Sequence, residues 1–192
     1  MLGLSLALSA CNAKDGEPAP GGDVSEVADQ VEALRNGAID VALLRPPLTD
    51  GTLTLTPLRE ERLVVAVPEN HRLAARGQVR VADLAGTDLI IHSAGRRSAM
   101  YDVVEHLLTD AGITPTIRHE VGETSTMITL VAGGLGVAVV PEPVTALPLA
   151  GVAYRPLVRP ARRIGLAVAH RAERREPHLR RTLEVITALA RR

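Results

Sequence analysis

The pattern of apolar and polar positions is clearest in residues 122–143, GETSTMITLVAGGLGVAVVPEP. Apolar side chains at helical spacing within residues 127–131 predict a helix, with a hydroxyl of Thr124 or Ser125 as its N-cap. The backbone N–H groups at the start of such a helix point outward and can hold an anion. The alternative is that these hydroxyls only cap and solvate the helix.

The second half of this stretch predicts a helix end followed by a buried strand. Gly133 and Gly134 tolerate the left-handed conformation that ends a helix, and the apolar residues 137–140 are stopped by Pro141. The order is therefore helix, glycines, strand. A dinucleotide-binding fingerprint has the reverse order, with the glycines between a strand and the helix that holds the pyrophosphate. We therefore exclude a nucleotide loop here.

The rest of the chain alternates between predicted strands and helices. This alternation favours an α/β protein with a parallel sheet that is covered by helices on both faces. A capping box of Asp23 and Glu26 begins the first helix, and Pro177 begins the last, whose apolar stripe is Leu179, Leu183, Ile186 and Leu189. The predicted strands are residues 39–44, 53–58, 62–67, 89–91, 116–121, 137–140, 152–158 and 164–169. The predicted helices are residues 23–37, residues 99–111, the helix between its cap at Thr124 or Ser125 and Gly133, and the helix from Pro177, with a short helical turn at 81–84.

Composition limits the core and the electrostatic field of the protein. The 192 residues include no Phe or Trp and two Tyr, so the core must be aliphatic. Basic and acidic residues number 22 each, and this balance provides no overall field that attracts nucleic acid. Ten arginines lie between Arg159 and Arg192, either as a contact surface or as a solvated helix face.

The residues known for catalysis and metal binding do not form a recognisable motif. The histidines show no i,i+4 pair and no HExxH arrangement, GxSxG is absent, and Cys11 is the one cysteine. His92 and Ser93 are neighbours in a strand pattern, so their side chains point to opposite faces and are poorly placed for a catalytic pair. We expect no catalytic residues, no metal and no cofactor.

Two polar segments are candidates for binding an anion. Arg45 follows a predicted buried strand, at the sheet edge where ligands of open α/β proteins bind. His92, Ser93, Arg96 and Ser98 belong to a loop that leads into a helix, where charge and helix dipole both favour a carboxylate or phosphate. The alternatives are that Arg45 pairs with a local carboxylate or solvent, and that the loop is only an exposed helix cap.

The order and spacing of several local patterns resemble the effector-binding domain of LysR-type bacterial transcriptional regulators. The resemblance covers roughly residues 27–189. The patterns are VEALRNGAIDVALLR, PLREERLVVAVPENHRLA, VRVADLAG, DAGITP, TLVAGGLGVAVVPEP, GVAYRPL and a terminal helix after LAVAHR.

The resemblance implies a type II periplasmic-binding-protein-like fold with two α/β lobes joined by two crossing strands. These strands would be residues 62–67 and 164–169, and the first strand of the family's domain would be missing. The implied division is an irregular segment at residues 1–22, lobe I at residues 23–67 plus 164–192, and lobe II at residues 68–163.

The resemblance also implies a sensor and not an enzyme. A small, anionic metabolite would bind in the cleft between the lobes, and the domain would associate as a homo-oligomer or with a partner regulator. The winged helix-turn-helix of the family is not visible, so we expect no direct DNA binding by this chain, and we expect a cytoplasmic location. The implied effector contacts are Arg45, His92, Ser93, Arg96, Ser98, Thr124 and Ser125.

An exported solute-binding lipoprotein of the same fold is the alternative. Leu8-Ser9-Ala10-Cys11 looks like a lipobox, and the polar residues after it resemble a flexible tether. The apolar run before Cys11 has no Lys or Arg ahead of it, whereas an export signal normally begins with positive charge. We therefore expect no membrane association unless Cys11 is lipidated. A hydrolase acting through Ser93 is a third, less favoured reading.

Overall fold

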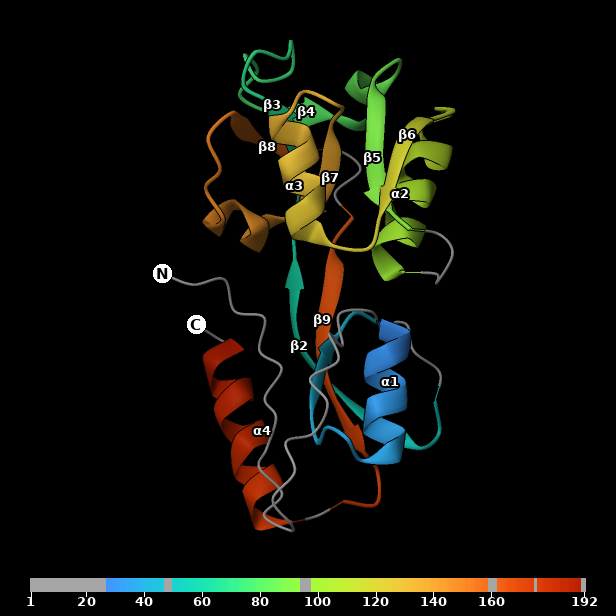
Figure 1. Ribbon diagram of the computed structural model, residues 1–192, viewed down its shortest axis with the longest axis vertical. Coiled ribbons are helices and arrows are strands. Elements are labelled where there is room, and N and C mark those ends of the chain that lie inside the picture. The colour runs from blue at the N-terminus through green and yellow to red at the C-terminus, as the bar shows by residue number, and fades with distance from the viewer. Residues whose placement is uncertain (1–26, 47–49, 94–97, 159–161, 175, 191–192) are drawn as a thin grey trace. The chain divides into compact units, whose positions relative to one another are not determined.

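The structure, a computed structural model, divides the chain into two compact units (Figure 1). Unit 1 contains residues 60–164, and unit 2 contains the described residues of 2–59 and 165–192. The predicted capping box at Asp23 and Glu26 and the lipobox at Cys11 lie outside the described residues. The structure describes residues 27–46, 50–93, 98–158, 162–174 and 176–190.

Unit 2 packs α1 against a three-stranded sheet whose order is β1-β9-β2. β1 runs antiparallel to β9, with Leu43 opposite Val168. Leu34 of α1 is fully buried among apolar side chains of these strands. The predicted strands and helices of this unit are confirmed. Its elements are α1 (Val27–Asn36), β1 (Ala42–Leu44), β2 (Leu53–Glu61), β9 (Ile164–Arg171) and α4 (Pro177–Ala190).

The change from one unit to the other falls within β2 and at the start of β9. It lies between Arg59 and Glu60 and again between Ile164 and Gly165. In this division β3, which covers most of the predicted crossing at residues 62–67, lies in unit 1, and the role of these residues as a crossing strand stays a prediction. The apolar alternation that predicts β2 stops at Leu58, whereas backbone pairing continues through the polar residues after it.

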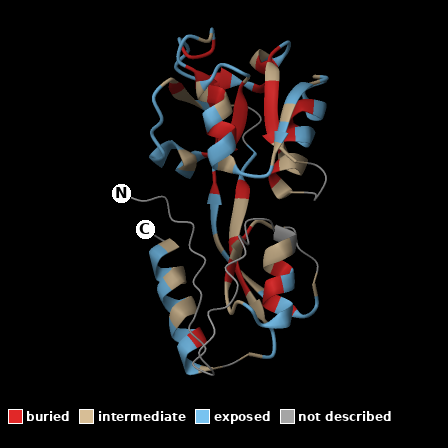
Figure 2. Cartoon of the chain, viewed as in Figure 1, coloured by how far each residue is buried: buried red, intermediate tan, exposed pale blue. Residues whose placement is uncertain are grey.

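The stripe predicted for α4 is only partly buried. Leu179 is the buried residue of this helix, whereas Leu189 is 62% exposed and Val185 is 52% exposed. Most of α4 has the colours of exposed and intermediate residues in Figure 2. The prediction of the helix is confirmed, and Leu189 of its apolar stripe is exposed in unit 2 as described. Periodicity reports which residues share a helix face, but not how much of that face is covered.

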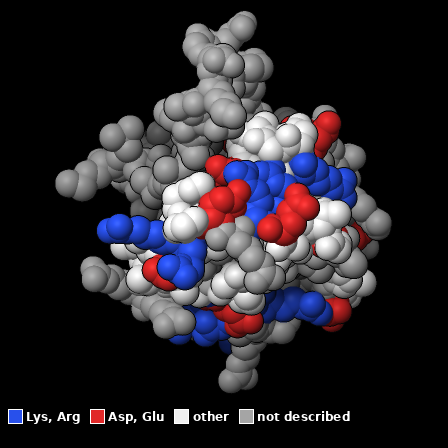
Figure 3. All heavy atoms as spheres, turned by 90° about the horizontal axis from the view of Figure 1, so that it is seen from below, with Lys and Arg blue, Asp and Glu red and all other residues white. Residues whose placement is uncertain are grey.

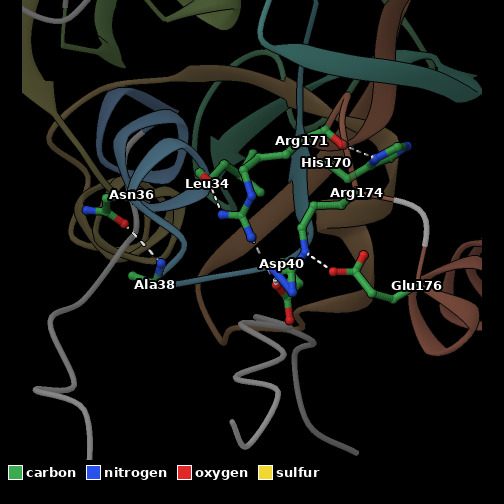
Figure 4. A network of polar contacts seen from close by, with 8 residues as sticks. All are labelled: Leu34, Asn36, Ala38, Asp40, His170, Arg171, Arg174 and Glu176. Atoms are coloured by element: carbon green, nitrogen blue, oxygen red, sulfur yellow. Dashed lines mark hydrogen bonds and ion pairs between the residues drawn. The ribbon is translucent and has the colours of Figure 1, made fainter.

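A polar network ties the end of α1 to the segment after β9 (Figure 4). Arg171 donates from Nη1 to the carbonyl oxygen of Leu34 and from Nη2 to Asp40 Oδ1 at 3.4 Å. Arg174 donates to the same Asp40 oxygen at 2.6 Å, and its hydrogen bond to Glu176 raises the pKa of the Arg174 guanidinium. These C-terminal arginines therefore donate to a helix end and to two carboxylates within unit 2.

Unit 1 contains a four-stranded sheet of order β4-β8-β3-β7 and the pair β5-β6. An isolated bridge between Leu89 and Val137 connects the two sets of strands. Its two hydrogen bonds join Val137 to Ile90 and to Asp88, each at 2.9 Å. The elements are β3 (Leu63–Pro68), β4 (Val79–Arg80), η1 (Val81–Leu84), β5 (Asp88–His92), α2 (Ala99–Asp110), β6 (Thr116–Val121), α3 (Thr124–Ala132), β7 (Ala138–Pro141), η3 (Glu142–Ala146) and β8 (Val152–Val158).

The strand directions of unit 1 are mixed, and the prediction of a parallel sheet is wrong for the strands around β3. β3 pairs antiparallel with both β7 and β8, whereas β4 with β8 and β5 with β6 are parallel. The apolar run of a buried strand is the same whichever way its neighbour points. The sequence pattern therefore predicts these strands without their directions.

The two faces of the unit 1 sheet carry two separate apolar cores. On β3, Leu63, Val65 and Val67 pack in the core that contains α2. Val64 and Ala66 pack in the core that contains α3. This follows from strand geometry, because successive side chains point to opposite faces. The prediction of helices on both faces is confirmed for unit 1.

Candidate functional site

β5 and β6 of unit 1 end at the same edge, and α3 begins there. The strands are parallel, with His92 opposite Val121, and the N–H of Ser93 donates to the carbonyl oxygen of Val121 at 3.0 Å. Thr124, the first residue of α3, follows Val121 after a two-residue connection. The structure therefore brings three of the predicted site residues, His92, Ser93 and Thr124, to one end of this strand pair.

The N-cap of α3 is Glu123, so the prediction that Thr124 or Ser125 caps this helix is wrong. Glu123 has the extended conformation of an N-cap (φ −114°, ψ 133°), whereas Thr124 is already helical. The Glu123 side chain makes no capping hydrogen bond. The half-buried Thr124 and the exposed Ser125 lie in the first turn, where backbone N–H groups have no partner within the helix.

Ser98 is the N-cap of α2. Its Oγ accepts a hydrogen bond from the N–H of Tyr101 at 3.0 Å, and its backbone is extended. The predicted start of this helix is confirmed, and the hydroxyl is already engaged in the cap. Arg96, predicted in the same loop, lies outside the described residues.

Arg45 follows β1 in unit 2. Its half-buried side chain donates from Nη1 to the carbonyl oxygen of Gly165 on β9 at 3.4 Å. Its position after a buried strand agrees with the sequence pattern. Its role in binding a ligand stays a prediction, as does that of the unit 1 residues.

Other kinds of site find no support among the described residues. They contain no group of three or more His, Cys, Asp or Glu side chains that could hold a metal ion. Within the same residues, no helix has the length and apolar character needed to span a membrane. Basic and acidic side chains lie next to one another on the face shown in Figure 3, in keeping with the balanced charge of the chain.

A cavity in unit 1 was not predicted from the sequence. It is a cavity of about 950 Å³ whose lining includes four arginines. Residues 62, 80, 162 and 163 form no motif along the chain, and only the pairing of β3, β8 and β4 brings their segments together. No spacing rule could have found this cavity.

The comparison with known proteins identifies one family. The LysR substrate binding domain family matches residues 23–191. The HTH-type transcriptional regulator TtuA of Agrobacterium vitis is 34% identical over 163 residues, which are 81% of this chain and 53% of TtuA. The HTH-type regulator BenM of Acinetobacter baylyi is 32% identical over 133 residues, or 68% of this chain and 44% of BenM. The chain thus spans about half the length of these relatives.

Solved structures agree with the sequence comparison. The BenM effector binding domain with its effector benzoate has a TM-score of 0.73 and 28% identity, over 85% of this chain and 74% of that one. CbnR, a LysR family transcriptional regulator, has a TM-score of 0.76 and 26% identity, over 85% and 56%. The predicted type II periplasmic-binding-protein-like fold is confirmed, and these relatives are regulators, not enzymes. The chain belongs to the LysR substrate binding domain family.

Proposed function

We propose that this chain is the effector-sensing domain of a LysR-family transcriptional regulator and that it binds a small anionic metabolite. The observation that carries the proposal is the family match over residues 23–191, together with the likeness to the BenM effector domain over 85% of the chain. Effector binding would favour one conformation of the domain over another and so change how it associates with other copies or partners. The output is a shift in population and requires no chemical step.

The proposed site begins at the end of β5. The backbone N–H of Ser93 donates a hydrogen bond to the carbonyl oxygen of Val121, which fixes the backbone of Ser93 at the end of the strand pair. The first turn of α3 lies beside it and offers backbone N–H groups and the hydroxyls of Thr124 and Ser125. These groups donate hydrogen bonds to a carboxylate, and the positive end of the helix dipole adds to the attraction.

The proposed positive charges are Arg45 and Arg96, with His92 as a further polar contact. Arg45 is half-buried, and its guanidinium already has a carbonyl acceptor in Gly165. A guanidinium has five N–H donors, so it can hold this contact and still bind a carboxylate. Ser98 belongs to the same loop as Arg96, and its hydroxyl can accept from Tyr101 while donating to a ligand.

The proposed partners follow from the regulators that the chain resembles. We propose that the domain senses its effector on behalf of a DNA-binding segment and associates as a homo-oligomer or with a second regulator. The experiment for this part is size-exclusion chromatography with light scattering of the full chain at several concentrations. A monomer at all concentrations, with and without an effector, would contradict the proposed association.

The binding site is tested with a panel of small carboxylates that starts from benzoate, the effector of BenM. Thermal unfolding of the purified chain is measured with each compound, followed by titration calorimetry of any that stabilise it. We expect Ser93→Ala and Arg45→Ala each to weaken binding about tenfold, the effect of losing one hydrogen bond to a charged group.

Matched controls separate a site effect from a general one. Thr145→Ala removes an exposed hydroxyl on η3, and Arg118→Ala removes an exposed arginine on β6. Both should bind the same carboxylate as the unaltered chain does. Unchanged affinity in Ser93→Ala and Arg45→Ala would count against this site.

A further inference from the structure

Unit 1 contains a cavity of about 950 Å³ that shares no residue with the proposed effector site. Its lining includes residues at the start of β3, at the end of β8, and in and next to β4. None of the residues proposed for the effector site belongs to its lining. A volume of this size is within the range of small-molecule sites, roughly 300–1,000 Å³.

The lining carries more positive than negative charge. Arg62, Arg80, Arg162 and Arg163 all line it, and Glu142 is the carboxylate among the lining residues that the structure describes. The side chains of Arg62 and Arg163 are exposed and form no ion pair with any described residue.

The nearby acidic groups neutralise only part of this charge. Asp110 pairs with Arg162 but is not itself part of the lining. Asp83, near Arg80, accepts from the Arg76 guanidinium at 2.8 Å and from the backbone N–H of Arg80 at 2.9 Å. These two hydrogen bonds and the positive charges beside it hold the pKa of Asp83 below its ordinary value. Its charge is therefore shared with Arg76, outside the cavity.

The strands hold the arginine-bearing segments apart at a fixed spacing. β8 lies between β3 and β4, with Val64 opposite Pro156 and Arg80 opposite Val158. Two strand spacings separate β3 from β4, so the backbones next to Arg62 and Arg80 are about 10 Å apart. Two anionic groups on one small molecule can span that distance when each meets a flexible arginine side chain.

Part of the cavity lining is apolar. Leu63 and Val64 of β3 are among the lining residues, and Pro156, Leu157 and Val158 add apolar atoms from β8. A fully inorganic ion would leave this surface uncovered, whereas an organic anion would place its carbon atoms against it and its charged groups toward the arginines. The lining thus combines the two features of a site for an organic anion.

We infer that this cavity binds a small organic anion with at least two negative charges, carried by carboxylate or phosphate groups. The guanidinium fork matches both groups through paired N–H donors. Of the four lining arginines, Arg62, Arg80 and Arg163 form no ion pair with a described residue. Arg80 also carries its charge close enough to Asp83 to lower the pKa of that carboxyl, so Arg62 and Arg163 are the main contacts. Arg80 and Arg162 complete the positive lining.

The test uses titration calorimetry of the full chain with three probes. Citrate supplies several carboxylates, phenyl phosphate supplies a phosphate with an apolar group, and sodium chloride at equal ionic strength is the control. We expect saturable binding of citrate or phenyl phosphate, and the probe that binds distinguishes the two chemistries. Arg62→Gln and Arg163→Gln should each weaken that binding about tenfold.

The controls keep the result interpretable. Arg118→Gln changes an exposed arginine whose partner is Asp88, away from the cavity, and should leave the affinity unchanged. Ser93→Ala should also bind the probe normally, which separates this site from the effector site. Circular dichroism and thermal unfolding verify that the Gln variants fold, as expected for exposed side chains.

Three outcomes would overturn the inference. The first is that neither probe binds beyond the chloride control. The second is that Arg62→Gln and Arg163→Gln, both folded, bind as tightly as the unaltered chain. A further titration with heparin gives the third: binding of this polymer without binding of either small probe would identify the arginines as a surface for a macromolecular polyanion.

Discussion

Arg155 on β8 donates two hydrogen bonds to the carbonyl oxygen of Ala74, from Nε at 2.9 Å and from Nη2 at 2.6 Å. Its remaining Nη1 group donates to the carbonyl oxygen of Tyr154 at 2.8 Å. Ala74 is buried, so its carbonyl oxygen has little access to water. A single guanidinium thus ties the loop after β3 to the neighbouring strand β8.

Replacement of this guanidinium should lower the stability of the chain. Arg155→Lys keeps the charge but cannot make the paired contact with Ala74, and we expect a loss of about 1–2 kcal/mol in the free energy of unfolding. Urea denaturation measures this value. The control is Arg118→Lys, an exposed ion-paired arginine on β6, which should stay within about 0.5 kcal/mol. Equal losses in the two variants would contradict the prediction.

Gly136 should be far less tolerant of a side chain than Gly134, although both have positive φ. A Cβ at Gly136, where φ is 155°, would lie 2.8 Å from the Asp88 carbonyl oxygen, whereas one at Gly134, where φ is 76°, would meet nothing within 4 Å. We expect Gly134→Ala to cost about 1–2 kcal/mol from conformation alone. Gly136→Ala should cost about 1–3 kcal/mol more, because β5 and β7 must separate.

Chemical denaturation of the two glycine variants gives the comparison directly. Both glycines lie in the connection between α3 and β7, so any general effect of adding a methyl group there is common to the two variants. A Gly136→Ala protein as stable as Gly134→Ala would mean that the bridge between Leu89 and Val137 adjusts without cost.

Ser98 and Ser125 provide a matched test of helix capping. Ser98 caps α2 through Tyr101, so Ser98→Ala should lower the free energy of unfolding by about 1 kcal/mol. Ser125 lies inside the first turn of α3, and its hydroxyl caps nothing in the structure described. Ser125→Ala should therefore change the free energy of unfolding by less than about 0.5 kcal/mol. Thermal unfolding of both variants without ligand measures the difference, and the reverse order would show that the cap of α3 is Ser125 after all.

His71 should make stability depend on pH. Its Nδ1 accepts the N–H of Leu73 at 3.3 Å, and burial, followed by the charge of Arg72, lowers the pKa of its imidazole. The unfolded chain therefore binds more protons than the folded one below an ordinary histidine pKa of about 6.5. The contribution of His71 is complete above that pH and is lost as the pH falls through the folded pKa.

The variant His71→Asn isolates this effect, because the amide oxygen can accept from Leu73 but does not titrate. We expect stability to fall less steeply between about pH 6.5 and 5 in the variant than in the unaltered chain. Urea denaturation across this range provides the slopes. Parallel curves would mean that other groups account for the pH dependence.

Local signals along the chain predict most elements of the structure. The strands at residues 116–121 and 152–158 have the predicted bounds, because polar or glycine-containing segments flank each of them. Ser98 lies immediately before a predicted helix, and the structure makes it the N-cap. These features depend on neighbours within a few residues, which the sequence displays.

Features that depend on distant segments could not be predicted in this way. The antiparallel pairing of β3 with β8 depends on where the chain returns after η3, and the arginine cavity depends on that pairing. The N-cap of α3 is set by the backbone conformation of the connection after β6, in which Glu123 is the extended residue. Glutamate is not a favoured N-cap, so residue preference pointed to Thr124 and Ser125 instead.

The alternation of β3 between two apolar cores has a consequence for how unit 1 unfolds. Val65 faces the core of α2 and Val64 the core of α3, so neither core can open without releasing the same strand. The two faces should therefore melt as one cooperative unit, and the amide hydrogens of β3 should exchange with solvent only when the whole unit opens. A substitution that loosens the core of α3 should therefore also destabilise the core of α2, because β3 contributes side chains to both.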